Sequence, residues 1–393
     1  MKIGLFSDTY YPQINGVATS VRMLRDNLLL AGHEVYVFTT TNPNAPDDEK
    51  NIIRIPSVAF RTERLGTYIR PRLYNEIKKL SLDIIHTHTE YTLGYLGRIM
   101  SKRLSIPQIH TMHTMYEYYT EYIARSKRLE SPIQAFARKL TVSFCNNADA
   151  VVVPTGKIED LIVSYGVNKK ISIIPTGIAL DKFAEHKNDL ATVKEIRSRL
   201  GILEDSYVLL YVGRIAHEKN INELLTSLQN YLLGKPQVFF VIVGKGPALT
   251  ELKALAEELG ISSKVIFAGA CLWDEINYYY RLGDIFVGAS QSETQGLTYI
   301  EAMASGLPVV AKEDRCLENL LVENENGYFF NSSDDMVKAV DKLLTDKQLR
   351  TLFSRNATIS ANKYSSDAYA EHMAILYTQV LKKQLIYDYN QIG

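Results

Sequence analysis

Cysteine and long apolar runs are scarce in this sequence. Only three cysteines occur in 393 residues, and Cys145, Cys271 and Cys316 are too widely spaced for a metal-binding set, so a reducing cytoplasm is expected. No apolar run approaches the roughly 18 residues that a membrane-spanning helix needs. The first residues, MKIGLFSD, lead into an expected strand without the apolar region of a signal peptide.

Motifs of several enzyme classes are also missing. The first expected strand is followed by SDTYYPQINGV instead of Gly-x-Gly-x-x-Gly, which argues against a dinucleotide cofactor. There is no Walker loop and no Gly-x-Ser-x-Gly elbow. There is also no Asp-x-Asp pair for a divalent ion, and no helix-turn-helix, RRM-like or zinc-finger pattern. We therefore predict no bound cofactor, no metal and no nucleic-acid partner.

The charges balance over the whole chain but are unevenly distributed. Residues 1–180 contain 22 Lys and Arg against 16 Asp and Glu, a net charge of +6, and residues 181–393 contain 22 against 28, a net charge of −6. A basic front half suits an anionic partner. The length of the chain, at roughly 100–200 residues per domain, predicts two domains.

Short β-rich runs alternate with segments of helical periodicity along most of the chain. This alternation is typical of α/β domains with a parallel sheet and helices on both faces, so we predict two Rossmann-like domains. The boundaries are placed at 1–177 and 178–366, followed by a terminal helix at 367–393. The expected strands are 2–7, 35–39, 83–88, 107–113, 150–154, 171–175, 207–213, 238–244, 264–268, 285–289 and 309–311.

One stretch, FVGASQSETQGLTYIEAMASGLPVVAK, combines a strand, a polar loop, a short helix and a second strand. Glu293 lies in the loop, and Glu301 lies in the helix, which is expected at 297–305. The amides of Gly296 and Leu297 at the start of this helix form a potential anion site. Amides for phosphate and carboxylates for hydroxyls together suit a nucleotide sugar.

A second stretch, YVGRIAHEKN, places two cations just after an expected strand. Arg214 and Lys219 are at a strand end of the kind that faces the ligand crevice in α/β sheets. Two cations there can neutralise a diphosphate, whereas the alternative is a pair of solvated loop charges. Gly244 and Gly246, after the next strand, either line the same crevice or serve only the turn.

Three histidines end two neighbouring strands. His113 follows one strand, and His86 and His88 end another. A strand-end histidine is either a hydrogen-bonded structural residue or part of a site. A zinc site is not expected, because no fourth ligand is evident.

Two basic, aromatic segments occur in the front half, at 61–80 and 115–140. In the first, Leu65, Ile69, Leu73, Ile77 and Leu80 fall at helical spacing, although Pro71 breaks any single helix there. The cations and tyrosines of both segments suit an anionic bilayer surface. The apolar positions could equally be core, with the cations solvated on the opposite face, so both interpretations stay open.

The arrangement of Glu293 and Glu301 around SETQGLTYIEAMASG resembles the Glu-x7-Glu motif of retaining glycosyltransferases of the B-type fold, and the likeness covers almost the whole chain. The resemblance implies two Rossmann-like domains with an interdomain cleft. The first domain would bind the acceptor and the second the nucleotide sugar. The terminal helix would cross back to the first domain.

The resemblance also implies roles for individual residues. Arg214 and Lys219 would bind the diphosphate with the amides of Gly296 and Leu297. Residues implied to contact other parts of the donor are Glu301 at the ribose, Glu293 and His113 at the transferred sugar, Gly16 near the phosphates, Gly244 in the crevice, and residues 270–272 at the base. No metal would be required.

Within that family the chain is most similar to bacterial glycolipid synthases, which transfer glucose from UDP-glucose to the 3-hydroxyl of diacylglycerol with retention. Many relatives have Phe-Gly after the first glutamate, whereas this chain has Thr294-Gln295-Gly296, which is usual in lipid-directed members. The implied partners are a UDP-hexose, diacylglycerol and an anionic membrane, with peripheral attachment to the inner face of the cell membrane. A glycosylated lipid or soluble sugar as acceptor, and a non-catalytic nucleotide-sugar-binding protein, remain alternatives.

Overall fold

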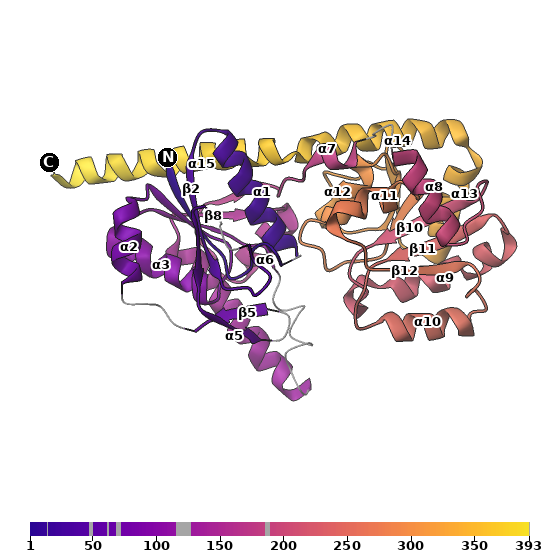
Figure 1. Ribbon diagram of the computed structural model, residues 1–393, viewed down its shortest axis with the longest axis horizontal. Coiled ribbons are helices and arrows are strands. Elements are labelled where there is room, and N and C mark those ends of the chain that lie inside the picture. The colour runs from indigo at the N-terminus through magenta and orange to yellow at the C-terminus, as the bar shows by residue number, and fades with distance from the viewer. Residues whose placement is uncertain are drawn as a thin grey trace. The chain divides into compact units, whose positions relative to one another are not determined.

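The computed structural model of the chain describes residues 1–13, 15–46, 50–60, 63–67, 72–114, 127–184 and 189–392 (Figure 1). These residues form two compact units, the first comprising Met1–Ile178 with Ser366–Gly393 and the second Ala179–Ser365. The expected boundaries differ from these by one residue. Both units are built on parallel sheets, as the alternation of strand and helix patterns predicts.

The first unit contains a seven-stranded parallel sheet in the order β3-β2-β1-β6-β7-β8-β9, together with a separate antiparallel hairpin, β4–β5. Its strands are β1 Lys2–Phe6, β2 Glu34–Thr40, β3 Ile52–Ile55, β4 Ser57–Phe60, β5 Glu63–Gly66, β6 Ile84–Thr87, β7 Gln108–Thr111, β8 Ala150–Val153 and β9 Ile171–Ile173. Its helices are α1 Gly16–Leu30, α2 Leu73–Leu80, α3 Thr92–Leu104, α5 Lys127–Asn147, α6 Gly156–Ser164 and α15 Ser366–Ile392.

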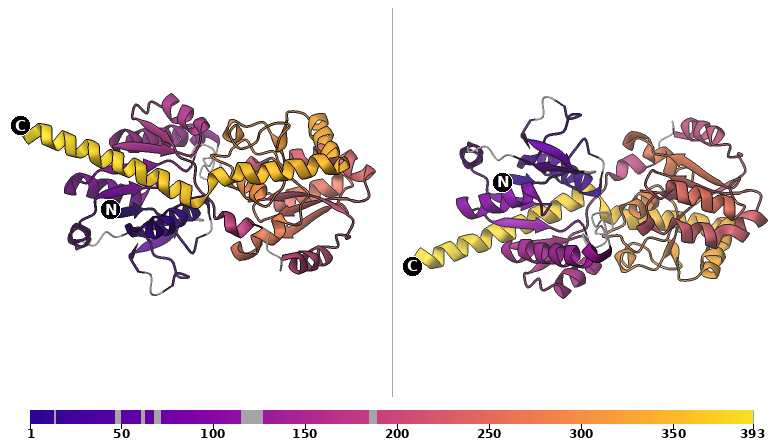
Figure 2. Two further views of the ribbon diagram at one scale, coloured as in Figure 1. Left: turned by 90° about the horizontal axis from the view of Figure 1, so that it is seen from above. Right: turned by 90° about the horizontal axis from the view of Figure 1, so that it is seen from below.

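Alternate residues of these strands pack on opposite faces of the sheet. Leu5 packs in a buried cluster with Leu24 of α1 and Met373 of α15, so the C-terminal helix lies beside α1 on one face (Figure 2). Phe6, the next residue of β1, packs in a different cluster with residues of α2 and α3, among them Ile77. The period of two along each strand therefore covers both faces of the sheet with helices.

The basic segment at 61–80 does not form one amphipathic helix, and the helical spacing of its apolar residues spans two different elements. Leu65 lies in strand β5, whereas Leu73 and Ile77 lie in α2 and are buried in the core. Lys78 and Lys79 are exposed on the other side of α2. The apolar face of α2 is therefore core. Arg61, Ile69 and Arg70 lie outside the described residues.

The second unit contains a six-stranded parallel sheet in the order β12-β11-β10-β13-β14-β15. Its strands are β10 Tyr207–Val212, β11 Val238–Val243, β12 Val265–Gly269, β13 Ile285–Gly288, β14 Val309–Lys312 and β15 Gly327–Phe330. Its helices are α7 Leu180–Phe183, α8 Asp189–Arg199, α9 Ile221–Gly234, α10 Leu249–Glu258, α11 Ile276–Tyr280, α12 Leu297–Ala304, α13 Ser333–Thr345 and α14 Lys347–Ala361, with 3-10 turns η2 His217–Lys219, η3 Trp273–Glu275, η4 Arg315–Leu317 and η5 Asn362–Tyr364.

Each sheet reverses its strand order beside its first strand. In the second unit β10 lies between β11 and β13, and in the first unit β1 lies between β2 and β6. In open parallel sheets ligands bind beyond the carboxyl ends of the strands at such a reversal. The fold thus predicts one ligand-binding edge on each unit.

None of the described helices is both long enough and apolar enough to cross a membrane.

Candidate active site

The loops that follow β10 and β13 are tied together at the reversal point of the second sheet. The Nδ2 of Asn220 donates a hydrogen bond to the carbonyl of Ala289 at 3.2 Å, and the Ser292 hydroxyl donates one to the carbonyl of Glu218 at 3.2 Å. Asn220 adopts a left-handed conformation, with φ 51°, between η2 and α9. These contacts join two segments that are about 70 residues apart in the sequence.

An ion pair joins the same two loops. The Nζ of Lys219 lies 2.6 Å from Oε1 of Glu293, and the two side chains are 16% and 18% exposed. A lysine ammonium has three donors, so a single lysine can contact more than one anionic group. The structure thus brings together two residues that the sequence singled out separately.

Arg214 lies in the first of these loops and is more open to solvent. Its Nη2 is 3.8 Å from Oε1 of Glu218, and its side chain is 44% exposed. Its backbone carbonyl accepts a hydrogen bond from the Tyr211 hydroxyl at 3.1 Å, which fixes the loop at the end of β10. The backbone at Arg214 is therefore fixed, and its side chain lies partly in solvent beside Glu218.

Helix α12 begins where the Glu293 loop ends. Its N-cap is Gly296, with φ 76°, and a glycine has no side chain with which to cap the helix. A Cβ on Gly296 would lie 2.8 Å from Cδ2 of Tyr299, so both the conformation and the space require glycine. The first amides of a helix have no acceptor within the helix itself, so the start of α12, including the amide of Leu297, favours an anion.

Glu301 is in the second turn of α12 and is buried, with 6% exposure. The Tyr280 hydroxyl donates a 2.6 Å hydrogen bond to its Oε2. Burial raises the pKa of Glu301 to about 7, although the Tyr280 hydrogen bond and the charge of Lys182 act in the opposite direction. The carboxylate therefore changes its charge near neutral pH while Tyr280 holds its orientation.

The segment predicted to contact a nucleobase follows β12. Leu272 is 66% exposed, and the next residue, Trp273, lies under the ammonium of Lys182, whose Nζ is 4.3 Å from the ring centroid. Trp273 is the single tryptophan of the chain. This segment presents an apolar, aromatic surface, and the contact of residues 270–272 with a nucleobase stays a prediction.

Gly244 is needed by the backbone, whatever its part in ligand binding. A Cβ on Gly244 would lie 1.9 Å from the carbonyl oxygen of Gly213, and its φ is +146°. A Cβ on Gly246 would lie 2.0 Å from the carbonyl oxygen of Ile215. The loops after β10 and β11 therefore approach one another closely, and ligand contact by either glycine stays a prediction.

On the first unit, Asp8 and Asn15 organise the loop between β1 and α1. The buried carboxylate of Asp8 accepts hydrogen bonds from the hydroxyls of Thr89 and Thr92 and from the amide of Leu93, so it caps α3. Asn15 caps α1 by accepting from the amide of Ala18 at 2.8 Å. Gly16 is the first residue of α1, and its contact with phosphate stays a prediction.

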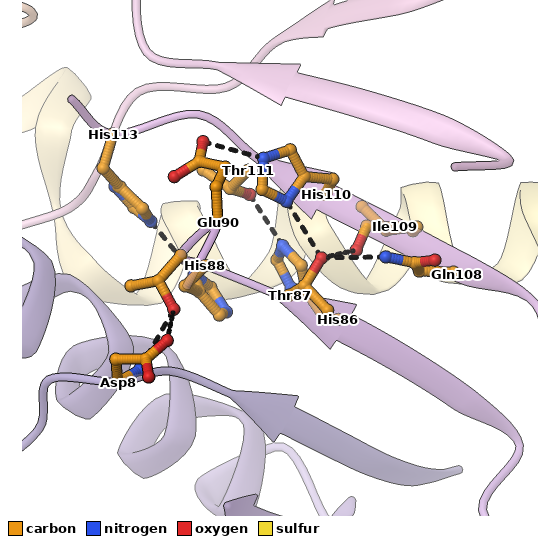
Figure 3. A network of polar contacts seen from close by, with 11 residues as sticks. Asp8, His86, Thr87, His88, Glu90, Gln108, Ile109, His110, Thr111 and His113 are labelled. Atoms are coloured by element: carbon orange, nitrogen blue, oxygen red, sulfur yellow. Dashed lines mark hydrogen bonds and ion pairs between the residues drawn. The ribbon is translucent and has the colours of Figure 1, made fainter. Parts of the chain in front are cut away.

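The strand-end histidines form a hydrogen-bonded stack at the ends of β6 and β7 (Figure 3). The Nδ1 of His88 is 3.0 Å from Nε2 of His113. His86 hydrogen-bonds through its two nitrogens to Tyr377 and Thr111, at 2.7 and 2.6 Å. Burial lowers the pKa of His113 to about 3 and the pKa values of His86 and His88 well below their usual range, so the three rings are neutral.

A further buried pair lies on the other face of the same strands. The Nε2 of His110 is 3.1 Å from Oε1 of Glu90, and its Nδ1 is 2.9 Å from the Thr87 hydroxyl (Figure 3). Across the described ranges, no three His, Cys, Asp or Glu side chains are arranged to hold a metal ion.

Sequence reasoning missed several residues that shape these sites. Tyr280, which orients Glu301, belongs to a Tyr-Tyr-Tyr run whose only signal was an unusual density of one residue type. Asp8 lay within a quoted motif but was not singled out. The direct contact between His88 and His113 depends on the pairing of β6 with β7, which adjacent strand ends only suggest.

Known proteins resemble this chain over its whole length. Residues 14–182 match the model of "Glycosyltransferase Family 4", and residues 192–359 match that of "Glycosyl transferases group 1". The chain is 38% identical to an alpha-monoglucosyldiacylglycerol synthase of Streptococcus pneumoniae, with 99% of this chain and 89% of that protein covered. It is 33% identical to a synthase of the same name from Acholeplasma laidlawii, with 98% of each chain covered.

Solved structures resemble the fold. The structure of Anabaena HepE in complex with UDP-glucose superposes with a TM-score of 0.75 at 17% sequence identity. The match covers 96% of this chain and 100% of HepE. Sucrose-phosphate synthase from Thermosynechococcus elongatus gives a TM-score of 0.74 at 23% sequence identity, and the match covers 97% of this chain and 99% of the synthase. These likenesses confirm the prediction of two Rossmann-like domains of the glycosyltransferase B type. Together with the identity to the two synthases, they show that the chain belongs to the group 1 glycosyltransferases.

Proposed function

We propose that this glycosyltransferase moves glucose from UDP-glucose to the 3-hydroxyl of diacylglycerol, with retention, at a membrane surface. The observation that carries the proposal is the placement of Arg214, Lys219, Glu293 and Glu301 around the ends of β10 and β13 and the N-terminus of α12. The names of the two synthases to which the chain is 38% and 33% identical support diacylglycerol as the acceptor.

In this proposal, cations and backbone amides bind the diphosphate of the donor, and carboxylates bind the hydroxyls of its two sugars. Arg214, Lys219 and the first amides of α12 bind the diphosphate, since a guanidinium, an ammonium and a helix N-terminus all favour anions. Glu301 accepts hydrogen bonds from the ribose hydroxyls, and Glu293 from hydroxyls of the transferred glucose. No metal is required in this scheme, because the two cations neutralise the leaving group.

In the reaction the bond between the anomeric carbon and the diphosphate oxygen breaks, and the acceptor oxygen bonds to the same face of the sugar. The acceptor proton passes to a phosphate oxygen of the departing UDP. Arg214 and Lys219 stabilise the charge that develops on the diphosphate, and they do so as fixed charges. Neutral His113 contributes a hydrogen bond to the transferred sugar.

Membrane attachment is proposed for helix α5 of the first unit. Phe136 is 67% exposed, and Arg138 and Lys139 nearby are also exposed. Phe136 and Lys139 are three residues apart and so lie on one side of the helix. An exposed aromatic ring with neighbouring cations suits an anionic bilayer, where each cation near the surface contributes about 1 kcal/mol.

Replacing single residues should separate turnover from binding. Arg214→Ala should lower kcat about 100- to 1,000-fold, because it removes a group that stabilises developing charge. Glu301→Ala should weaken UDP-glucose binding about 10- to 100-fold, because charge-assisted hydrogen bonds to the ribose are lost. Steady-state kinetics and calorimetry measure the two effects. Arg355→Ala, on the exposed side of α14, is the control, and wild-type kinetics in both site variants would refute the assigned roles.

The affinity for UDP-glucose should depend on pH through Glu301. Its pKa of about 7 means that the carboxyl group is protonated below neutral pH, where it accepts hydroxyl hydrogen bonds less well. Affinity should therefore fall as the pH drops from 8 to 6, and Glu301→Gln should remove this dependence. UDP-glucose is the suitable ligand, since its doubly esterified diphosphate lacks the terminal phosphate ionisation near pH 6. An unchanged pH profile in Glu301→Gln would contradict the assignment.

Product analysis tests the proposed function directly. Radiolabelled UDP-glucose and diacylglycerol in mixed micelles should give a single α-linked glucosyl lipid, with and without EDTA. Monoglucosyldiacylglycerol and soluble sugars serve as the competing acceptors. Label found only in one of those acceptors, or a β-linked product, would contradict the proposal, and loss of activity in EDTA would contradict its metal-free form.

Vesicle co-sedimentation tests the membrane surface. Phe136→Ser should reduce binding to anionic vesicles about 10- to 100-fold, because insertion of a phenyl ring into the bilayer contributes roughly 1.5–3 kcal/mol. Leu30→Ser is the matched control, since Leu30 is 85% exposed on α1 of the same unit. Equal binding of wild type and Phe136→Ser, or stronger binding to neutral than to anionic vesicles, would exclude this surface.

A further inference from the structure

We propose that His88 is a positioning residue for His113: it donates a hydrogen bond from Nδ1 to Nε2 of His113 and thereby fixes both the ring orientation and the tautomer of His113. In that tautomer His113 carries its proton on Nδ1 and offers it to a hydroxyl of the transferred sugar. The inference rests on the proposed function, which assigns His113 to that sugar.

The first support is the geometry of the stack. The two rings are 5.3 Å apart between centroids and inclined by 21°, and the nitrogens that face each other are 3.0 Å apart (Figure 3). His88 is 1% exposed, whereas His113 is partly exposed. His88 is thus the fixed, interior member of the pair, and His113 is the member that a ligand can reach.

The second support is the anchoring of His88 from below. Its ring lies 4.0 Å from that of His86, centroid to centroid. His86 is held at both nitrogens, by Tyr377 of α15 and by Thr111 of β7. Both nitrogens of His86 are occupied, so neither is left to hydrogen-bond to His88. The ring of His88 therefore packs against an imidazole whose orientation is fixed by hydrogen bonds.

The third support is an account of the proton between the two rings. Burial lowers the pKa of each ring, so both rings are neutral. The hydrogen bond between Nδ1 of His88 and Nε2 of His113 therefore contains a single proton, which belongs to one of the two rings. The Nε2 of His88 is buried and has no hydrogen-bond partner among the described residues. If His88 accepted from His113, this Nε2 would carry an unpaired, buried N–H, which is rarer and costlier than an unpaired acceptor.

The proton arrangement therefore follows from the buried Nε2. His88 carries its proton on Nδ1 and donates it to Nε2 of His113, and His113 in turn carries its own proton on Nδ1. A donor N–H suits a hydroxyl oxygen of the sugar. His113 thus becomes a donor because of a side chain that does not itself contact the substrate.

Two substitutions of the same shape test the hydrogen bond. Asn and Leu are nearly isosteric, and the amide of Asn places a donor N–H where Nδ1 of His88 lies. His88→Asn should keep kcat within about threefold, whereas His88→Leu should lower kcat about 10- to 100-fold, as expected for a misplaced or wrongly protonated contact group. The dissociation constant of UDP should stay unchanged in both variants, because neither His88 nor His113 is among the residues proposed to contact UDP.

The control variant is Gln108→Met. Gln108 is buried on β7 and donates a hydrogen bond to Thr87, away from His113. Its replacement should lower the thermal unfolding midpoint without lowering kcat. Unfolding midpoints of all the variants then show whether a loss of activity merely follows a loss of stability.

A double-mutant cycle with His113→Ala decides between the outcomes. If His88 acts through His113, His88→Leu should cause no further loss of kcat in the His113→Ala background. Wild-type kcat in His113→Ala would overturn the role proposed for His113 itself. If His113→Ala is impaired, the positioning role is overturned by wild-type kcat in His88→Leu, by equal losses in the Asn and Leu variants, or by additive losses in the double mutant.

Discussion

The ion pair between Lys219 and Glu293 is the contact on which the site of the second unit depends. It joins the loop after β10 to the loop after β13. These loops are neighbours because β10 lies beside β13 at the point where the sheet reverses its strand order. Each charge compensates the other in the free protein, so two partly buried ionised groups are kept in place before a ligand arrives. The same pairing places Arg214 and the start of α12 at one edge of one sheet.

The two units differ in the charge of the side chains at the carboxyl ends of their strands. The second unit presents a cation–carboxylate cluster that suits a charged diphosphate and its neighbouring hydroxyls. The first unit presents buried, neutral imidazoles at the ends of β6 and β7, held by hydroxyl groups. Such a neutral site can orient a sugar by hydrogen bonds without competing with the phosphate for cations. This division of chemistry fits a glycosyltransferase, in which charge develops on the leaving group.

The sequence predicted the strands well because parallel strands buried on both faces are short apolar runs bounded by turn residues. Every expected strand is present, with ends within two residues. Strands β3 and β15 and the β4–β5 hairpin were not predicted. Three of the four residues of β3 are only partly buried, and β5 falls within a segment whose apolar spacing imitates a helix at Leu65. Glu293 and Lys219 could be proposed separately from local motifs. Their 2.6 Å contact, and the orientation of Glu301 by Tyr280, depend on strand order, which local patterns do not encode.

The central claim is that cations and helix amides of the second unit bind a diphosphate while Glu293 and Glu301 hold the hydroxyls on either side. Calorimetric titration of wild type and Glu293→Gln with both UDP and UDP-glucose tests it most directly. We predict one site per chain, with similar UDP affinity in the two proteins and a gain from the glucose moiety that only the wild type shows. Absence of binding by UDP and UDP-glucose, or an equal gain from glucose in both proteins, would contradict the account.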